Sequence, residues 1–224
     1  MLGFTVYIMK KTNIIRILVA ITLLSIVVMT ICLAMLREGP QQHLTDFGPM
    51  PEFTLLDQDG QSWTSSSFEG STILISFLYT KCLDSCPILA HRLSYIHKEL
   101  SQSDLFTENL LFVSIVLDDG PLDAAELQTY RETANLPDKN WVLLTGTRKQ
   151  VTDLMTEGFK LALNIEPSIH VHADGSLHRH AEGSIAISHS NRLILVDQSR
   201  SIRRYYDGLS IEPTNLIADL SKFQ

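Results

Sequence analysis

Apolar and polar residues alternate along the chain in blocks that predict strands and helices in turn. Two long apolar runs, residues 71–79 and 110–117, are rich in β-branched and aromatic residues and predict buried strands. Shorter strands are predicted at residues 51–56, 141–144, 193–196 and 202–206. Helical spacing of leucine and isoleucine, or a proline at the start, predicts helices from residue 87 and over 124–134, 147–161 and 214–222. Strands that alternate with helices and end in a hairpin and a helix predict an α/β domain with a mixed central sheet.

The longest apolar run lies near the N-terminus, at residues 17–36. It holds no charged residue and is long enough to cross about 30 Å of hydrocarbon as a helix. Lys10, Lys11 and Arg16 precede the run, whereas only Arg37 follows it with a positive charge, so the N-terminus is expected in the cytoplasm. A cleaved signal peptide is the alternative, but it has a shorter apolar region that ends in a small-residue cleavage site, and none follows here.

We therefore predict an uncleaved single-pass anchor in the inner (cytoplasmic) membrane, or the equivalent mitochondrial inner membrane, with the folded domain on the periplasmic or outer side. The predicted division is a cytoplasmic N-terminus at 1–16, a transmembrane helix at 17–36, a tether at 37–50 and a folded domain at 51–224.

Charge and composition narrow the function. Eighteen basic and twenty-five acidic residues give a net charge of −7, which argues against a nucleic-acid-binding surface. Beyond residue 40, fourteen basic and twenty-four acidic residues remain, so the exported part is expected to be acidic. Apolar and aromatic residues are spread through that part, which argues against disorder and for one sizeable core.

The chain has three cysteines, of which Cys32 lies in the predicted span and is expected to act as a small apolar residue. Cys82 and Cys86 stand between a predicted buried strand and a helix that begins near Pro87. The positive end of a helix lowers thiol pKa, so we expect both to favour the thiolate. Thiolates bind soft metals and act as nucleophiles, which leaves copper(I) binding and thiol–disulfide exchange open. A structural disulfide is the third interpretation, but so small a loop would stabilise the fold little.

The cysteine pair belongs to a longer series of motifs. In chain order these are Tyr79-Thr80-x-Cys82-x-x-x-Cys86-Pro87, Phe112-Val113-Ser114-Ile115 before an acidic turn, Leu144-Thr145-Gly146-Thr147, and His189-Ser190 before an apolar strand that ends in Asp197. Together they resemble the Sco/SenC family of membrane-anchored, thioredoxin-like copper-binding proteins, and the resemblance covers most of residues 45–224.

This resemblance implies a thioredoxin-like fold in which Cys82, Cys86 and His189 bind copper. It also implies a partner: copper would be delivered to the copper-A centre of cytochrome oxidase subunit II, or the thiols of that centre kept reduced. Two thiolates and an imidazole suit copper(I) and can also hold copper(II). The alternative is an oxidoreductase acting on another envelope copper or thiol protein, in which one cysteine attacks and the other resolves. Three intervening residues and a matching histidine favour a binding protein over an enzyme.

Three positions depart from the family pattern. Ser188 precedes the histidine where the family usually has aspartate, and Leu83 follows the first cysteine where proline is usual. The acidic turn at 118–121 is a looser version of the family's turn. These changes leave the three copper ligands in place and leave the oxidase-assembly role to be tested.

A histidine-rich segment at 168–182 lies outside the resemblance. Two pairs of alternating histidines flank Asp174-Gly175, a strong turn signal, so a hairpin is expected. Suitable register would gather four imidazoles into a second site for copper(II) or zinc, formed by His170, His172, His178 and His180. The alternative is an exposed polar hairpin that binds nothing. The isolated histidines are predicted to be surface residues: His43, His91 and His97.

Overall fold

The computed structural model describes residues 19–31, 44–82, 85–118, 120–167, 169–171, 177–179 and 185–223, and over 164–189 it describes the backbone alone. The chain forms two compact units, Met1–His43 and Leu44–Gln224. In the first unit residues 19–31 are helical. Within the described ranges, no helix combines the length and the apolar character needed to span a membrane. Residues 17, 18 and 32–36 of the predicted anchor lie outside these ranges.

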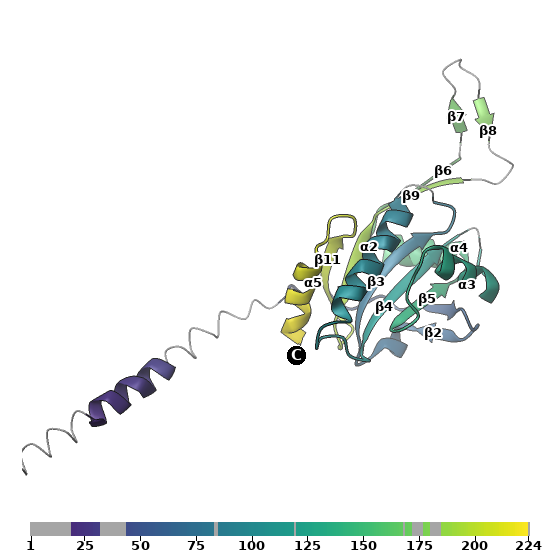
Figure 1. Ribbon diagram of the computed structural model, residues 1–224. Coiled ribbons are helices and arrows are strands. Elements are labelled where there is room, and N and C mark those ends of the chain that lie inside the picture. The colour runs from purple at the N-terminus through teal and green to yellow at the C-terminus, as the bar shows by residue number, and fades with distance from the viewer. Residues whose placement is uncertain are drawn as a thin grey trace, which may run out of the picture. The chain divides into compact units, whose positions relative to one another are not determined.

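A seven-stranded sheet forms the centre of the second unit (Figure 1). From edge to edge its strands are β11 (Ile202–Asp207), β10 (Arg192–Val196), β3 (Thr72–Tyr79), β4 (Leu110–Leu117), β5 (Trp141–Thr145), β1 (Thr54–Asp57) and β2 (Ser62–Thr64). Strands β3, β4 and β5 are parallel, and the remaining neighbours are antiparallel. The prediction of an α/β domain with a mixed central sheet is therefore confirmed.

Helices cover both faces of this sheet. The helical segments are η1 (Ser65–Phe68), α2 (Ser85–Leu100), α3 (Ala124–Thr133), α4 (Arg148–Asp153), the π-helical turn η2 (Leu154–Gly158), α5 (Pro213–Leu220) and η3 (Ser221–Phe223). Alternate residues of β3 point to opposite faces, so Leu74 and Leu78 pack with α2, α3 and α5, whereas Ile75 and Phe77 pack with α4 and η2. All eight β3 side chains are buried, as expected for a central parallel strand.

The helix ends differ slightly from prediction. Helix α2 begins at Ser85, two residues before Pro87, its predicted first residue. The helix predicted over 147–161 divides into α4 and the π turn η2. Thr147 caps the start of α4, because its hydroxyl accepts a hydrogen bond from the backbone N–H of Gln150 at 3.3 Å. These shifts leave the order of the elements unchanged.

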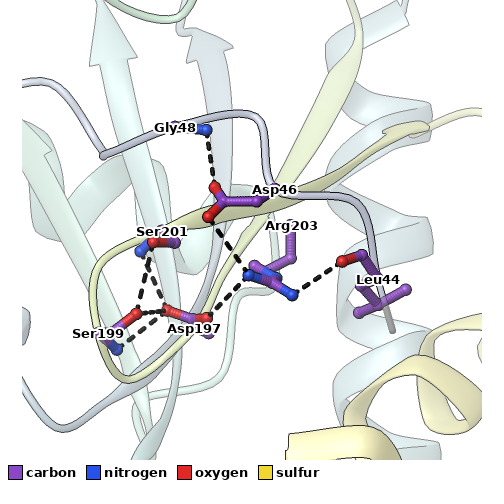
Figure 2. Close-up of polar contacts among 7 residues, drawn as sticks. All are labelled: Leu44, Asp46, Gly48, Asp197, Ser199, Ser201 and Arg203. Atoms are coloured by element: carbon purple, nitrogen blue, oxygen red, sulfur yellow. Dashed lines mark hydrogen bonds and ion pairs between the residues drawn. The ribbon is translucent and has the colours of Figure 1, made fainter. Parts of the chain in front are cut away.

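The last seven residues of the predicted tether, 44–50, are docked on the free edge of β11. The backbone N–H of Phe47 donates to Ile202 O at 2.9 Å, and Ile202 N–H donates to Gly48 O at 2.8 Å. Figure 2 shows the guanidinium of Arg203 beneath this segment, where Nη2 donates to Leu44 O at 2.8 Å. Its Nη1 lies 3.8 Å from a carboxylate oxygen of Asp46. This segment therefore covers an edge that would otherwise expose unpaired backbone groups.

Two further strand pairs lie outside the central sheet. Strand β6 (Leu163–Pro167) pairs antiparallel with β9 (Ile185–His189), and β7 (Ile169–Val171) pairs antiparallel with β8 (Leu177–Arg179). In the second pair His170 lies directly opposite His178. The predicted hairpin is thus formed over its described residues.

Candidate metal-binding and thiol site

The cysteine-bearing turn begins where two parallel strands end. The register of β3 and β4 finishes with Tyr79 opposite Leu117, and the chain then turns from β3 into helix α2. The backbone N–H of Cys82 donates to Tyr79 O at 3.2 Å, which closes this turn. Cys86 lies in the first turn of α2. The predicted placement of the pair, between a buried strand and a helix start, is confirmed.

The two thiols differ in their access to solvent. Cys86 is 1% exposed and packs into the core, whereas Cys82 is partly exposed. The backbone N–H of Cys86 donates to Cys82 Sγ at 3.5 Å, so the helix N-terminus faces the first sulfur. Both residues are thiols in this structure. The turn therefore presents one accessible and one buried soft ligand on a single helix start.

Burial changes the acidity of the second thiol. Removal from water and, to a lesser extent, hydrogen bonding with Cys82 together raise the pKa of the Cys86 thiol to about 12. Our expectation that the helix would lower the pKa of both cysteines is therefore wrong for Cys86, because desolvation exceeds the effect of the helix end. The pKa of the Tyr130 hydroxyl is raised, mainly by its own burial and further by the charges of Cys86 and Cys82. Tyr130 of α3 is a neighbour of the thiols that the sequence did not indicate.

A buried carboxylate adjoins the turn. Asp118, the residue after β4, is 3% exposed. The hydroxyl of Thr80 donates to its Oδ2, and the Lys81 ammonium lies 3.1 Å from its Oδ1. These three side chains and Tyr130 line a cleft of about 610 Å³ that runs along α3. No local pattern in the sequence indicates this contact, because it depends on which strands are neighbours.

The backbone brings His189 to the same end of the sheet. His189 is the last residue of β9 and pairs with Leu163, and β10 starts three residues later at Arg192. Because β10 runs antiparallel to β3, its start lies at the end of β3 that leads to Cys82. Among the side chains that the structure describes, no group of three or more His, Cys, Asp or Glu residues could hold a metal. The side chain of His189 is not among them, so its role as a ligand stays a prediction.

The other predicted histidines have different outcomes. His170 and His178 are cross-strand partners by backbone register, while His172 and His180 lie outside the described residues, so the second metal site stays a prediction. His91 is exposed, as predicted, and His43 lies outside the described residues.

His97 is a correction, because it is 6% exposed rather than on the surface. Its ring packs against the rings of Phe106, Phe112 and Trp141, at centroid distances of 4.9, 5.1 and 5.7 Å. His97 follows Leu93 by four residues, so helical spacing could have placed it on the core face.

Comparison with known proteins places this chain in a family. A family model described as SCO1/SenC matches residues 42–224. The SCO2-like protein of Rickettsia typhi is 25% identical over 209 residues, which cover 89% of this chain and 94% of that relative.

Solved structures share the fold at lower identity. Bradyrhizobium japonicum ScoI, solved with copper bound, matches with a TM-score of 0.61 and 20% identity, over 79% of this chain and 99% of that one. BsSco, a member of the Sco family of cytochrome c oxidase assembly proteins with a disulfide switch, matches with a TM-score of 0.62 and 19% identity, over 81% and 97%. These matches confirm the thioredoxin-like fold. Because the family model spans the whole second unit of the structure, the chain belongs to the SCO1/SenC family.

Proposed function

We propose that this protein is a membrane-tethered copper chaperone that holds copper through Cys82, Cys86 and His189. The observation that carries the proposal is the cysteine turn, where the Cys86 N–H approaches Cys82 Sγ at 3.5 Å on the helix start. The sheet topology supports it, because the backbone of His189 reaches the same end of the sheet. Two thiolates and one imidazole fit copper(I) by their softness and number.

The unequal exposure of the two thiols sets the order in which they would contact copper. Cys82 is the accessible sulfur and would meet incoming copper first, and the buried Cys86 would complete the pair. Binding displaces a proton from each thiol, and release to an acceptor returns those protons. Transfer is then an exchange of ligands without a change in the copper oxidation state. We propose the copper-A centre of cytochrome oxidase subunit II as the acceptor, since BsSco belongs to a family of cytochrome c oxidase assembly proteins.

Thiol–disulfide exchange is the second candidate, and the close approach of the two cysteines on one turn favours it. The Cys82 thiolate would attack a disulfide of the partner, and Cys86 would displace the partner's second thiol. This chain would end with a Cys82–Cys86 disulfide and the partner with two thiols, so two electrons and two protons pass to the partner. An external thiol would have to restore the reduced pair.

The two candidates are separated by anaerobic copper(I) titration of the full-length protein in detergent, with a competing chelator. We expect one tightly bound copper, which Cys82→Ser or Cys86→Ser nearly abolishes. His189→Ala should weaken copper(II) more than copper(I), since two thiolates alone can hold the softer ion. Cys32→Ser and His91→Ala are the matched controls and should bind as the wild type does.

Tight copper(I) binding by the double cysteine variant would refute the chaperone assignment. Weak binding by the wild type, together with rapid reduction of a disulfide-bonded partner peptide, would favour the oxidoreductase instead.

A further inference from the structure

The ends of β3 and β4 are joined by side chains as well as by the sheet. Tyr79 and Leu117 are the last paired residues, so Thr80 and Asp118 follow at the same level on adjacent parallel strands. The Thr80 hydroxyl donates to Asp118 Oδ2, and Lys81 Nζ lies 3.1 Å from Oδ1. Each carboxylate oxygen therefore holds one of the two residues that precede Cys82.

A carboxylate at this position is costly for the fold. Asp118 is 3% exposed, and removing a charge from water carries a penalty that an ion pair offsets only with good geometry. Lys81 is 59% exposed, so its attraction is screened by solvent. The Lys81 ion pair therefore offsets only part of this cost. The contacts of Asp118 with Thr80 and Lys81 tie two consecutive turn residues to the end of β4.

The two cysteines are held in place by different parts of the fold. Cys86 is 1% exposed and belongs to α2, whose Leu89 and Leu93 are buried in the core. Cys82 lies outside any helix or strand, and its backbone N–H donates to Tyr79 O at 3.2 Å. The Asp118 contact acts on the two residues between Tyr79 and Cys82. Besides the hydrogen bond from the Cys86 N–H, the position of Cys82 Sγ therefore follows from where this turn is held.

We propose that Asp118 is a positioning residue for the copper site: through Thr80 and Lys81 it holds Cys82 at the distance from Cys86 that one metal ion requires. The inference rests on the proposed function, because a copper ion bound by both sulfurs requires that distance. Partners that orient metal ligands are commonly worth 10–100-fold in affinity, which sets the expected effect.

The test compares copper(I) affinity among variants of the full-length protein in detergent, all in a Cys32→Ser background. Asp118→Asn keeps the shape and removes the charge, and Thr80→Val removes the hydroxyl. Both should weaken copper(I) by roughly 10–100-fold. Thr80→Ser restores a donor and should bind within about threefold of wild type.

Asp219→Asn is the matched control. Asp219 is also 3% exposed, lies 2.9 Å from Arg204 Nη1 and accepts from the Tyr206 hydroxyl at 2.7 Å, on the strand β11 and helix α5 side of the domain. This variant should lose stability and keep its copper affinity. Equal loss of affinity in Asp219→Asn and Asp118→Asn would overturn the proposal, because the effect would then be general destabilisation. Wild-type affinity in both Asp118→Asn and Thr80→Val would overturn it as well.

A second measurement needs no copper and separates this inference from the proposed function. Each variant is equilibrated with oxidised glutathione, which converts the Cys82–Cys86 dithiol into a disulfide and releases two reduced glutathione molecules. A loosened turn lowers the effective concentration of one thiol at the other, so disulfide formation should fall by more than about threefold in Thr80→Val but not in Thr80→Ser. If the wild type bound no copper and disulfide formation still fell in Thr80→Val but not in Thr80→Ser, the chaperone assignment would fail and the positioning role would stand. An unchanged equilibrium in Thr80→Val would refute the positioning role.

Discussion

Acid should weaken the domain through His97, a buried histidine on the helix that carries Cys86. Its Nε2–H donates to Lys139 O at 2.8 Å, and three aromatic rings surround it. Burial lowers the pKa of His97 and outweighs the hydrogen bond to Lys139, which raises it, while the Lys139 ammonium lowers it further. The folded state therefore favours the neutral form of the His97 ring.

The direction of the effect follows from proton linkage. Above pH 6.5 His97 is neutral in both states and adds no pH dependence. Below pH 6.5 the unfolded chain takes up a proton that the folded chain resists, so the free energy of unfolding falls until the pH reaches the lowered folded pKa. At pH 5 the loss can reach at most about 2 kcal/mol, from 1.36 kcal/mol per pH unit over about 1.5 units. For a domain of this size that equals a fall in Tm of about 4–8 °C.

The perturbation is His97→Gln, which keeps a side-chain N–H and removes the titration. Urea unfolding of wild type and variant at pH 7.5, 6.5, 5.5 and 5.0 gives the gap between their free energies of unfolding. We expect the wild type to be the more stable at pH 7.5, with the gap closing by up to about 2 kcal/mol at pH 5. His91→Gln, an exposed histidine of the same helix, should run parallel to wild type. A gap for His97→Gln that is constant with pH would show that His97 does not weaken the domain in acid.

Two further predictions concern the parts of the chain beyond the cysteine site. The charge bias around residues 17–36 should leave Lys10 and Lys11 in the cytoplasm and export the folded domain, so a C-terminal reporter active only in the cytoplasm would refute that topology. The register that pairs His170 with His178 supports a second, weaker equivalent of copper(II) or zinc at pH 7.5. Replacing His170, His172, His178 and His180 together by alanine should remove that equivalent and spare copper(I) binding, whereas unchanged stoichiometry would reduce the segment to a polar hairpin.

The sheet and the cysteine turn were predictable from sequence because their signals are local. Strands β3 and β4 are buried on both faces, which makes each a continuous apolar run. The cysteine pair followed directly on such a run and preceded Pro87, so its place at a strand-to-helix turn needed no tertiary information. The family motifs then added the distant His189.

The acidity of Cys86 and the burial of Asp118 were not predictable in this way. The pKa of Cys86 depends on how deeply its side chain is buried beneath α2, and the local sequence does not determine that burial. The contact between Thr80 and Asp118 requires that β3 and β4 be parallel neighbours in one register, although 38 positions separate the two residues. The docking of residues 44–50 rests on backbone hydrogen bonds to β11 and on the contacts of Arg203 with Leu44 O and Asp46, and all of these require that β11 be the edge strand next to this segment.

Cys86 is held by a packed helix and Cys82 by a turn. If the proposed function is correct, this difference gives a physical reason why one site can both bind and release copper. A ligand on the buried face of α2 moves only when the core moves, since packed interiors yield little. A ligand on a turn is held by a few polar contacts, each worth about 1 kcal/mol, and can be displaced by a competing thiolate at much lower cost. An acceptor that approaches the exposed face therefore meets Cys82 first and can take over that position while Cys86 still holds the metal. In this exchange copper(I) is bound by Cys86 and the acceptor at the same time and is never free. Dissociation of copper(I) from both thiolates at once would cost far more free energy.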